Sequence, residues 1–305
     1  MITGIKGIRF RRAAAVVVTT GAVLATGALT TAPAQAAPAA PAVPTIVAKG
    51  GFLMNNANGA SLYTKAADTR LSTGSTTKIM TAKVVLSQRN LDLNAKVTIQ
   101  KAYSDYIVAH TASSAGLIVG DKVTVRQLLY GLMLPSGCDA AYALADKFGT
   151  GSTRAARVKS FIGKMNSTAH DLGMTNSKFD SFDGIGNGAN FSTPRDLTKL
   201  ASNAMKSSAF RAVVKTQNFK EKVITSNGGT RWMSWENTNK PLLSGYAGTI
   251  GIKTGSGPEA KYCLVFAATR NGKTVIGTVL ASASVADRTS DAKKLMNYGF
   301  ARLNG

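Results

Sequence analysis

The apolar positions of this chain change their spacing along the sequence, and the change predicts where strands and helices lie. Two short apolar runs flank Asn55-Asn56-Ala57-Asn58-Gly59. Because an Asn-Gly pair favours the positive φ angles of a tight turn, we expect a hairpin over 51–64. Near the other end, β-rich apolar runs at 263–269 and 274–282 flank Arg270-Asn271-Gly272-Lys273, which predicts a second hairpin. Further strands are expected at 96–100, 212–225 and 248–253.

Between these runs the apolar residues recur with the period of a helix. Thr124 and Gln127 form a capping-box pair ahead of an apolar stripe. Pro135-Ser136-Gly137-Cys138 ends that helix because Pro and Gly interrupt the repeat. Other helices are expected from about 75 to 88 and at 139–148, 153–172, 193–205 and 290–300. Strands at both ends of a helical middle predict an α+β fold, in which one antiparallel sheet receives an inserted, mostly helical subdomain.

The first 36 residues have the pattern of a secretory signal peptide. A basic segment precedes an apolar run at 13–29, and Ala34-Gln35-Ala36 is a small-residue cleavage signature. We therefore predict a secreted, extracytoplasmic protein of the cell envelope that is cut after Ala36 and is peripheral or soluble. An uncleaved N-terminal anchor is the alternative.

The remaining sequence predicts a short lead-in and a single domain. Residues 37–48 are rich in Ala and Pro, which predicts a flexible segment. Residues 49–305 are long enough for one substantial core. Within them we expect a sheet subdomain at 49–75 and 209–305 and a helical subdomain at 76–208.

The chain is strongly basic, with 37 Lys and Arg against 15 Asp and Glu and a formal net charge of +22. Such a surface favours anionic partners, which for an exported protein are wall polymers or a membrane surface with acidic head groups. Solubility through net charge is an equally valid interpretation. The basic residues are scattered and no nucleic-acid signature is present, so we expect no nucleic-acid partner, and we expect a monomer.

The chain has only two cysteines and two histidines, which limits the disulfides, metal sites and histidine-dependent catalysis that it can support. Cys138 and Cys263 could form one disulfide, but two thiols are not a disulfide framework. Neither cysteine has a histidine or a second cysteine near it in the sequence, so we predict no metal site and no cofactor. With only His110 and His170 in the chain, a Ser-His-Asp hydrolase is disfavoured.

The segment Ser75-Thr76-Thr77-Lys78 stands at the start of a predicted helix. Ser75 and Lys78 are three residues apart, which places both on one face of the first turn. The hydroxyl then has an amine within reach and the unpaired N–H groups of the helix start beside it. These are the components of an acyl-transfer site: a nucleophile, a base and donors for an oxyanion. A helix cap followed by a solvated lysine produces the same motif, so the motif alone decides nothing.

Two further segments are candidates for the same site. Ser136 lies on a turn between two helices, where a side chain can face a cleft, although loop serines are usually turn formers. Lys253-Thr254-Gly255-Ser256 follows a predicted strand and presents a cation and hydroxyls at a sheet edge. Gly255 there lets another segment approach closely. The ordinary alternative is a strand that ends in a polar turn.

Taken together and in this order, Ser-x-x-Lys, Ser-Gly-Cys and Lys-Thr-Gly resemble the motif set of the penicillin-recognising serine enzymes. The chain is most similar to the low-molecular-mass penicillin-binding proteins, which are serine-type D-alanyl-D-alanine carboxypeptidases and transpeptidases. The resemblance implies a β-lactamase/transpeptidase-like fold with a five-stranded antiparallel sheet flanked by helices. Four other stretches support it: 134–137, 183–187, 192–197 and 237–239.

The resemblance also implies a catalytic role for three residues. Ser75 would be acylated by the penultimate D-alanine of a peptidoglycan stem peptide, and β-lactam antibiotics would be covalent inhibitors. Lys78 would be the base, which requires a neutral amine, and the nearby charge of Lys253 together with partial desolvation favours that state. Ser136 would relay a proton to the leaving D-alanine.

The same resemblance assigns substrate binding to the Lys-Thr-Gly segment and the residue after it. Lys253 and Thr254 would hold the terminal carboxylate by charge and by hydrogen bond. Gly255 and Ser256 would line the same wall, and the backbone N–H groups of Ser75 and Ser256 would form the oxyanion hole.

One position departs from the commonest family pattern, because Cys138 stands where most members have Asn. An amide can bond both the lysine and the substrate, whereas a thiol is a weak donor and acceptor. We therefore expect Cys138 to border the cleft and to contribute to substrate binding, while another group orients Lys78.

Three alternatives stay open at this stage. A serine β-lactamase shares the scaffold, but the sequence between Ser136 and Lys253 has no Glu-x-x-Leu-Asn stretch, and its only Glu residues are Glu221 and Glu236. A catalytically weak, basic wall-binding module would keep the motifs as vestiges. The balance between carboxypeptidase and transpeptidase depends on cleft shape, which the sequence does not show.

Overall fold

The computed structural model describes residues 40–304, so the predicted signal peptide at 1–36 lies outside the described residues. The strands of this part are β1 (Gly50–Asn55), β2 (Ser61–Lys65), β3 (Lys96–Thr98), β4 (Lys122–Thr124), β5 (Asn218–Ile224), β6 (Thr230–Glu236), β7 (Thr249–Gly257), β8 (Lys261–Arg270) and β9 (Lys273–Ser282). The helices are the 3-10 turn η1 (Gly74–Thr77) and α1 (Lys78–Leu86), α2 (Lys101–His110), α3 (Val125–Met133), α4 (Cys138–Phe148), α5 (Arg154–Asp171), α6 (Pro194–Ala204), α7 (Ser208–Lys215), α8 (Lys240–Gly245) and α9 (Val285–Asn304).

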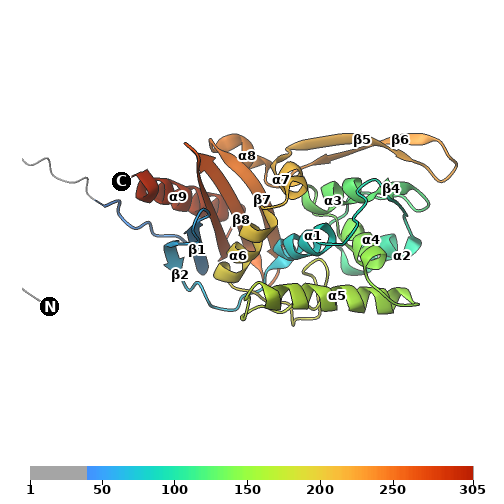
Figure 1. Cartoon of the computed structure of the whole chain (residues 1–305), viewed down its shortest axis with the longest axis horizontal. Helices are drawn as coiled ribbons and strands as arrows, with labels where there is room; N and C mark the ends of the chain where they lie inside the picture. The colour runs from blue at the N-terminus through green and yellow to red at the C-terminus, as the bar shows by residue number, and fades with distance from the viewer. Residues whose placement is uncertain (1–39, 305) are drawn as a thin grey trace, which may run out of the picture. The chain divides into compact units, whose positions relative to one another are not determined.

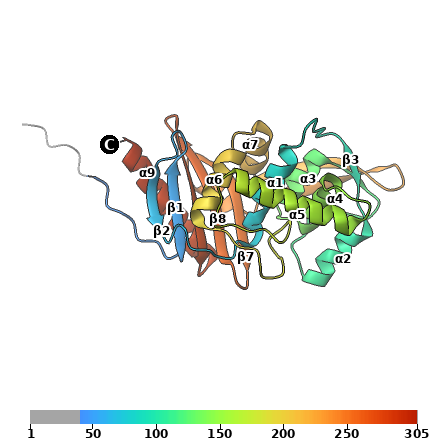
Figure 2. The ribbon, with the colours of Figure 1, turned by 60° about the horizontal axis from the view of Figure 1, so that its bottom comes forward.

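The main sheet has five antiparallel strands in the order β2-β1-β9-β8-β7. This order confirms the predicted five-stranded antiparallel sheet and both predicted hairpins. Strand β8 is buried on both faces, with Leu264 and Phe266 packed on one side and Val265 and Ala267 on the other. Helix α9 covers the first face and α6 lies on the second (Figures 1 and 2). The continuous apolar run at 263–269 is the sequence signature of a strand covered on both sides.

A second sheet lies among the helices and has the strand order β3-β4-β5-β6. This arrangement corrects the sequence prediction of one strand at 212–225 that belongs to the main sheet. The chain is helical as α7 to Lys215, and β5, which starts at Asn218, pairs with β4 and β6 instead. Val213 and Val214 are β-branched, but with Phe210 they form a buried stripe at helical spacing.

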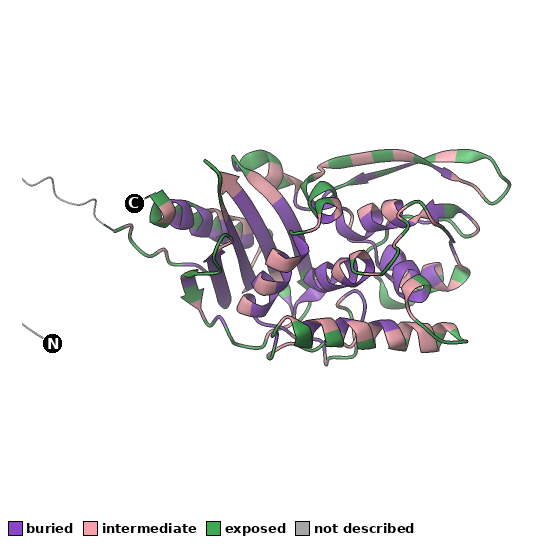
Figure 3. Ribbon diagram, in the orientation of Figure 1, coloured by how far each residue is buried: buried purple, intermediate pink, exposed green. Residues whose placement is uncertain are grey.

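Helix ends follow the capping chemistry of the sequence. The capping box of Thr124 and Gln127 is formed, with both reciprocal hydrogen bonds present at the start of α3. Thr193 caps α6, whose first residue is Pro194. Four elements were not predicted because they are short or lack a clear period: α2, β4, β6 and α8. Buried residues concentrate in β1, β7, β8 and β9 of the main sheet and in α1, α3 and α4 (Figure 3).

The end of the predicted lead-in is fixed to the last helix. Ile46 and Ala48 are buried, and Asp291 of α9 accepts hydrogen bonds from the backbone N–H of Val47 at 3.0 Å and of Ala48 at 2.8 Å. Asp291 is itself fully buried. A buried carboxylate that satisfies two backbone donors ties residues 46–48 to the domain.

We predict that Asp291→Ala lowers the free energy of unfolding by about 2 kcal/mol, because two backbone N–H groups lose their acceptor in a largely buried place. Chemical denaturation of the variant measures this difference. The matched control is Ser290→Ala, an exposed neighbour on the same helix, which should stay within about 0.5 kcal/mol of the wild type. Equal stability of the two variants would contradict the role given to Asp291.

Candidate active site

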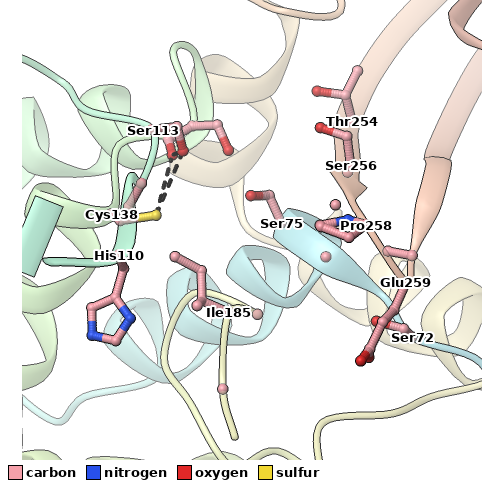
Figure 4. A pocket seen from close by; sticks show the side chains of 18 of the residues that line it. Ser72, Ser75, His110, Ser113, Cys138, Ile185, Thr254, Ser256, Pro258 and Glu259 are labelled. Atoms are coloured by element: carbon pink, nitrogen blue, oxygen red, sulfur yellow. Dashed lines mark hydrogen bonds between the residues drawn. The ribbon is translucent and has the colours of Figure 1, made fainter. Parts of the chain in front are cut away.

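The predicted site segments converge on one cleft of about 600 Å³. Ser75 comes from η1, Ser136 and Cys138 from the turn into α4, and Thr254 and Ser256 from β7. Figure 4 shows Ser75 between Cys138 on one wall and the strand that carries Thr254 and Ser256 on the other. The two predicted lysines lie beneath this cleft and do not line it.

The two walls meet through close backbone contacts. A Cβ on Gly255 would lie 2.7 Å from the carbonyl oxygen of Thr73, so only glycine lets β7 approach the η1 turn this closely. Gly74 has φ +50°, and a Cβ on it would lie 3.0 Å from the backbone nitrogen of Ser256. The backbone around Ser75 and that of Ser256 therefore face each other across a short gap, as two oxyanion donors require.

Lys78 is buried at 0% exposure and its amine has three acceptors. The Nζ atom donates to Ser75 Oγ at 2.9 Å, to Cys138 Sγ at 3.2 Å and to the carbonyl oxygen of Asp183 at 3.4 Å. The expectation that a group other than Cys138 must orient this lysine is therefore only half right. The thiol is one of its acceptors, and the Asp183 carbonyl supplies the further contact.

Cys138 lines the cleft, as expected, but only 1% of it is exposed. Its backbone N–H donates to the carbonyl oxygen of Ser113 at 2.8 Å, and its Sγ lies 3.5 Å from Ser113 Oγ. Burial raises the pKa of the Cys138 thiol, and the positive charge of Lys78 offsets part of that rise. Cys138 and Cys263 are both free and buried, so they do not form the disulfide that the sequence left open. Within residues 40–304, no His, Cys, Asp and Glu side chains cluster as a metal site would require.

Ser136 has an unusual backbone conformation and a hydroxyl that takes part in no hydrogen bond described for residues 40–304. Its φ is +66°, and its Oγ is buried without a hydrogen-bond partner in the described part of the chain. Ser113 Oγ donates to the carbonyl oxygen of Ser136 at 2.6 Å and so holds this turn. A strained residue with a free hydroxyl in a cleft wall is typical of a side chain that is held for a ligand.

Lys253 is buried at 1% exposure on β7, and its Nζ contacts only the carbonyl oxygen of Thr254, at 3.2 Å. Burial lowers the pKa of Lys253 well below the ordinary lysine value, and the charges of Lys78 and Arg288 lower it further. Thr254 Oγ1 lies 2.6 Å from Thr238 Oγ1. Among residues 40–304, none of the ion pairs includes Lys78, Lys253 or Arg288. The cations of this wall are therefore not paired with a carboxylate, although Glu259 lines the cleft in the exposed turn that follows the same strand.

Four groups that shape the site were not identified from the sequence: Ser113, the Asp183 carbonyl, Asn190 and Arg288. Asn190 Nδ2 donates to the hydroxyls of Thr73 and Thr77 and holds the η1 turn. Arg288 Nη1 donates to the carbonyl oxygen of Gly255 at 3.1 Å. Asp183 stands in a stretch that already carried family resemblance. The other three lie outside every motif, so no pattern in one sequence could have singled them out.

A serine hydroxyl bonded to a buried amine, beside a positive wall and two facing backbone segments, defines a serine acyl-transfer enzyme for substrates that carry a carboxylate. The family comparison agrees with this class. A family model described as "D-alanyl-D-alanine carboxypeptidase" matches residues 35–284, and the chain belongs to that family. The enzyme class and fold class predicted from the sequence are thereby confirmed.

Individual relatives give the same result. The chain is 71% identical to a D-alanyl-D-alanine carboxypeptidase of Streptomyces sp. (strain K15) over 96% of its length and 100% of that protein. It is 34% identical to the carboxypeptidase DacC of Escherichia coli and covers 62% of that relative's length. The crystal structure of the Streptomyces K15 DD-transpeptidase superposes with a TM-score of 0.84 at 75% identity, over 86% of this chain and 100% of that one.

The unpaired burial of Lys253 predicts a stability cost. We expect Lys253→Met to raise the free energy of unfolding by about 1 to 3 kcal/mol at about pH 7, because an apolar side chain replaces a buried cation. Since the folded-state pKa of Lys253 is lowered, the unfolded chain binds more protons between the two pKa values, and wild-type stability rises with pH in that window. The gain in Lys253→Met should therefore shrink toward about pH 10.

Urea titrations at several pH values measure this gain. Lys49→Met, which removes an exposed lysine just before β1, is the control and should show no comparable pH-dependent gain. A variant that is less stable than the wild type at neutral pH would contradict the interpretation of Lys253 as an unsatisfied buried cation.

Proposed function

We propose that this protein is an exported serine D,D-peptidase that acts on the D-Ala-D-Ala terminus of peptidoglycan stem peptides through an acyl-enzyme on Ser75. The observation that carries the proposal is the hydrogen bond of 2.9 Å between Lys78 Nζ and Ser75 Oγ inside a cleft. It supports a nucleophile and a base in direct contact. Family membership supports the substrate class.

Acylation would begin with attack of Ser75 Oγ on the carbonyl carbon of the penultimate D-alanine. Lys78, in its neutral form, takes the hydroxyl proton as the Oγ–C bond forms. The backbone N–H groups of Ser75 and Ser256 stabilise the negative charge on the carbonyl oxygen. The C–N bond then breaks, and Ser136 passes a proton to the nitrogen of the leaving D-alanine. The free Ser136 hydroxyl supports this role.

The terminal carboxylate of the substrate would bind along β7. Lys253 and Arg288 form no ion pair with a carboxylate within residues 40–304, and Thr254 supplies a hydroxyl at the cleft surface. A bound carboxylate relieves the repulsion between these cations, so the site prefers an anionic terminus. Either water or an amine then resolves the acyl-enzyme, which corresponds to carboxypeptidase or transpeptidase activity.

A β-lactamase needs a carboxylate that activates water beside the acyl-enzyme. Among the residues that line the cleft, the only carboxylate is that of Glu259, in the exposed turn between β7 and β8. The Asp183 carboxylate accepts a hydrogen bond from Tyr106 Oη at 2.9 Å and is fully buried. These positions disfavour rapid hydrolysis of a penicilloyl adduct and favour the D,D-peptidase.

Location in the cell envelope rests on the predicted signal peptide and on the extracytoplasmic substrate of the family. Helices that could cross a membrane are absent from the described residues 40–304. Stem peptides are the partners that the proposal requires, and β-lactams are the inhibitors.

The first test is labelling with a fluorescent penicillin. The wild-type protein should give a stable covalent band, and Ser75→Ala should lose it by about a thousandfold or more, because within residues 40–304 the Lys78 amine contacts no hydroxyl other than that of Ser75. A circular-dichroism spectrum and thermal unfolding of Ser75→Ala check that the fold is kept. Turnover of a donor peptide with and without an amine acceptor then separates hydrolysis from transfer. A label that persists in Ser75→Ala would refute the assignment of the nucleophile.

A second test concerns Cys138. A bulky thiol reagent should lower acylation by penicillin, since Sγ lies 3.2 Å from Lys78 Nζ. Because the pKa of the thiol is raised, the modification rate should increase about tenfold per pH unit below that pKa. Cys138→Ala should be insensitive to the reagent, whereas Cys263→Ala should remain sensitive. If the reagent modifies Cys138 and acylation does not change, the assigned position of Cys138 beside Lys78 in the cleft is wrong.

A further inference from the structure

The outer face of the four-stranded sheet is basic and exposed. It carries four lysines and one tryptophan, which we call the lysine face: Lys96, Lys122, Lys220, Lys222 and Trp232. All five side chains are exposed, whereas the valines and the methionine that alternate with them along the strands are buried. Because side chains alternate across a strand, the five project to the same side of the sheet. In Figure 3 exposed residues alternate with more buried ones along the β5–β6 hairpin.

Strand register brings these side chains together. Lys222 lies directly opposite Trp232, and the Nζ atoms of Lys220 and Lys222 lie 5.1 and 5.3 Å from the centre of the Trp232 ring. Lys122 pairs with Ile224, which is two residues from Lys222 on the same side of β5. With strands about 4.8 Å apart, the four amines spread over about 15 Å.

The positive charge of this face is not neutralised. Of the ion pairs and side-chain hydrogen bonds within residues 40–304, none involves the amine of one of its four lysines. The outer side of β6 ends at Glu236, whose carboxylate is already paired with Lys240 at 3.0 Å. Two ammonium groups held over one indole without a carboxylate fit a partner that brings negative charge and a flat apolar surface.

The lysine face is connected to the cleft by one strand. From Trp232 the chain runs along β6 to Thr238, which lines the cleft and contacts Thr254 Oγ1 at 2.6 Å. At about 3.3 Å per residue this path covers about 20 Å. The cleft of about 600 Å³ holds only the end of a stem peptide, so the polymer that bears it must continue over neighbouring surface.

We propose that the lysine face is a secondary binding site for the peptidoglycan strand whose stem peptide occupies the cleft. The inference rests on the proposed function and extends it from the peptide terminus to the polymer. Carboxylates of adjacent stem peptides pair with the lysines, and a sugar ring packs against the exposed indole of Trp232. An anionic bilayer fits less well, because apart from Trp232 and the half-buried Ile224 this face offers no large apolar side chain for insertion.

The test compares two charge variants that lose the same charge. Lys220→Gln/Lys222→Gln removes two amines of the lysine face, and Lys147→Gln/Lys178→Gln removes two exposed lysines elsewhere. Both proteins and Trp232→Ala are co-sedimented with purified insoluble peptidoglycan that has been stripped of phosphodiester polymers. The first variant should bind about three- to tenfold more weakly than the wild type, and its binding should depend less on salt. Trp232→Ala should also bind more weakly, and the control pair should bind like the wild type.

Two further arms separate this proposal from its alternatives and from the proposed function. Penicillin acylation and turnover of a short donor peptide should be unchanged in all three variants, since these reactions need only the cleft. If these reactions fail already in the wild type, the proposed function is refuted, whereas equal peptidoglycan binding by the two lysine variants overturns the secondary site alone. Vesicles with anionic lipid and a purified phosphodiester wall polymer are tested in parallel. Lysine-dependent binding to either, without binding to peptidoglycan, also overturns the proposal.

Discussion

The close approach of β7 to the η1 turn is the contact on which the whole site depends. The turn carries Ser75, and the strand carries the cation and the hydroxyl of the opposite wall. A Cβ at Gly255 would meet the Thr73 carbonyl at 2.7 Å and the Thr76 nitrogen at 3.1 Å, so any other residue would separate the two walls. A Cβ on Gly184 would lie 2.0 Å from the Gly74 carbonyl oxygen, and this contact brings the Asp183 carbonyl to Lys78. Three segments distant in sequence are thus joined at their backbones.

This junction brings the amines of Lys78 and Lys253 into the same buried region, but the two amines differ in how many hydrogen bonds they form. Lys78 has three acceptors, one of them the Ser75 hydroxyl, and is therefore fixed in direction before substrate binds. Lys253 has one carbonyl contact and faces other cations. Burial of an uncompensated cation destabilises a fold, and active sites are where such a cost is tolerated. In the proposed function, the substrate carboxylate supplies the missing charge, so the cost of burying Lys253 is recovered as a preference for an anionic terminus.

The sequence predicted the parts of the structure that depend on local chemistry. The Asn-Gly turns, the capping box at Thr124 and the Ser-x-x-Lys spacing are local, and each appears where the pattern places it. The strand predicted over 212–225 is correct only from Asn218 to Ile224, and its first part is wrong because Val213 and Val214 have strand propensity, while packing of α7 against the core decides for a helix. Arg288 reaches Gly255 only after α9 has folded onto the sheet, and Asn190 reaches Thr73 and Thr77 from a distant loop. Such contacts are properties of the tertiary structure.

The thiol at Cys138 changes which polar groups of the site are available to the substrate. An amide in its place would offer a donor to the substrate and an acceptor to the lysine, whereas the thiol contacts Lys78, Ser113 and the Ser136 carbonyl. Among residues 40–304 the Ser136 hydroxyl on the same wall has no hydrogen-bond partner, and the Lys78 amine donates to the Ser75 hydroxyl, the thiol and the Asp183 carbonyl. In the proposed reaction, the Ser136 hydroxyl and Thr254 with its neighbours on the β7 wall supply the hydrogen bonds to the substrate. Because this proposal has the β7 wall bind the terminal residue that leaves, loss of the D-alanine removes much of the binding and leaves the cleft of the acyl-enzyme open to its second reactant.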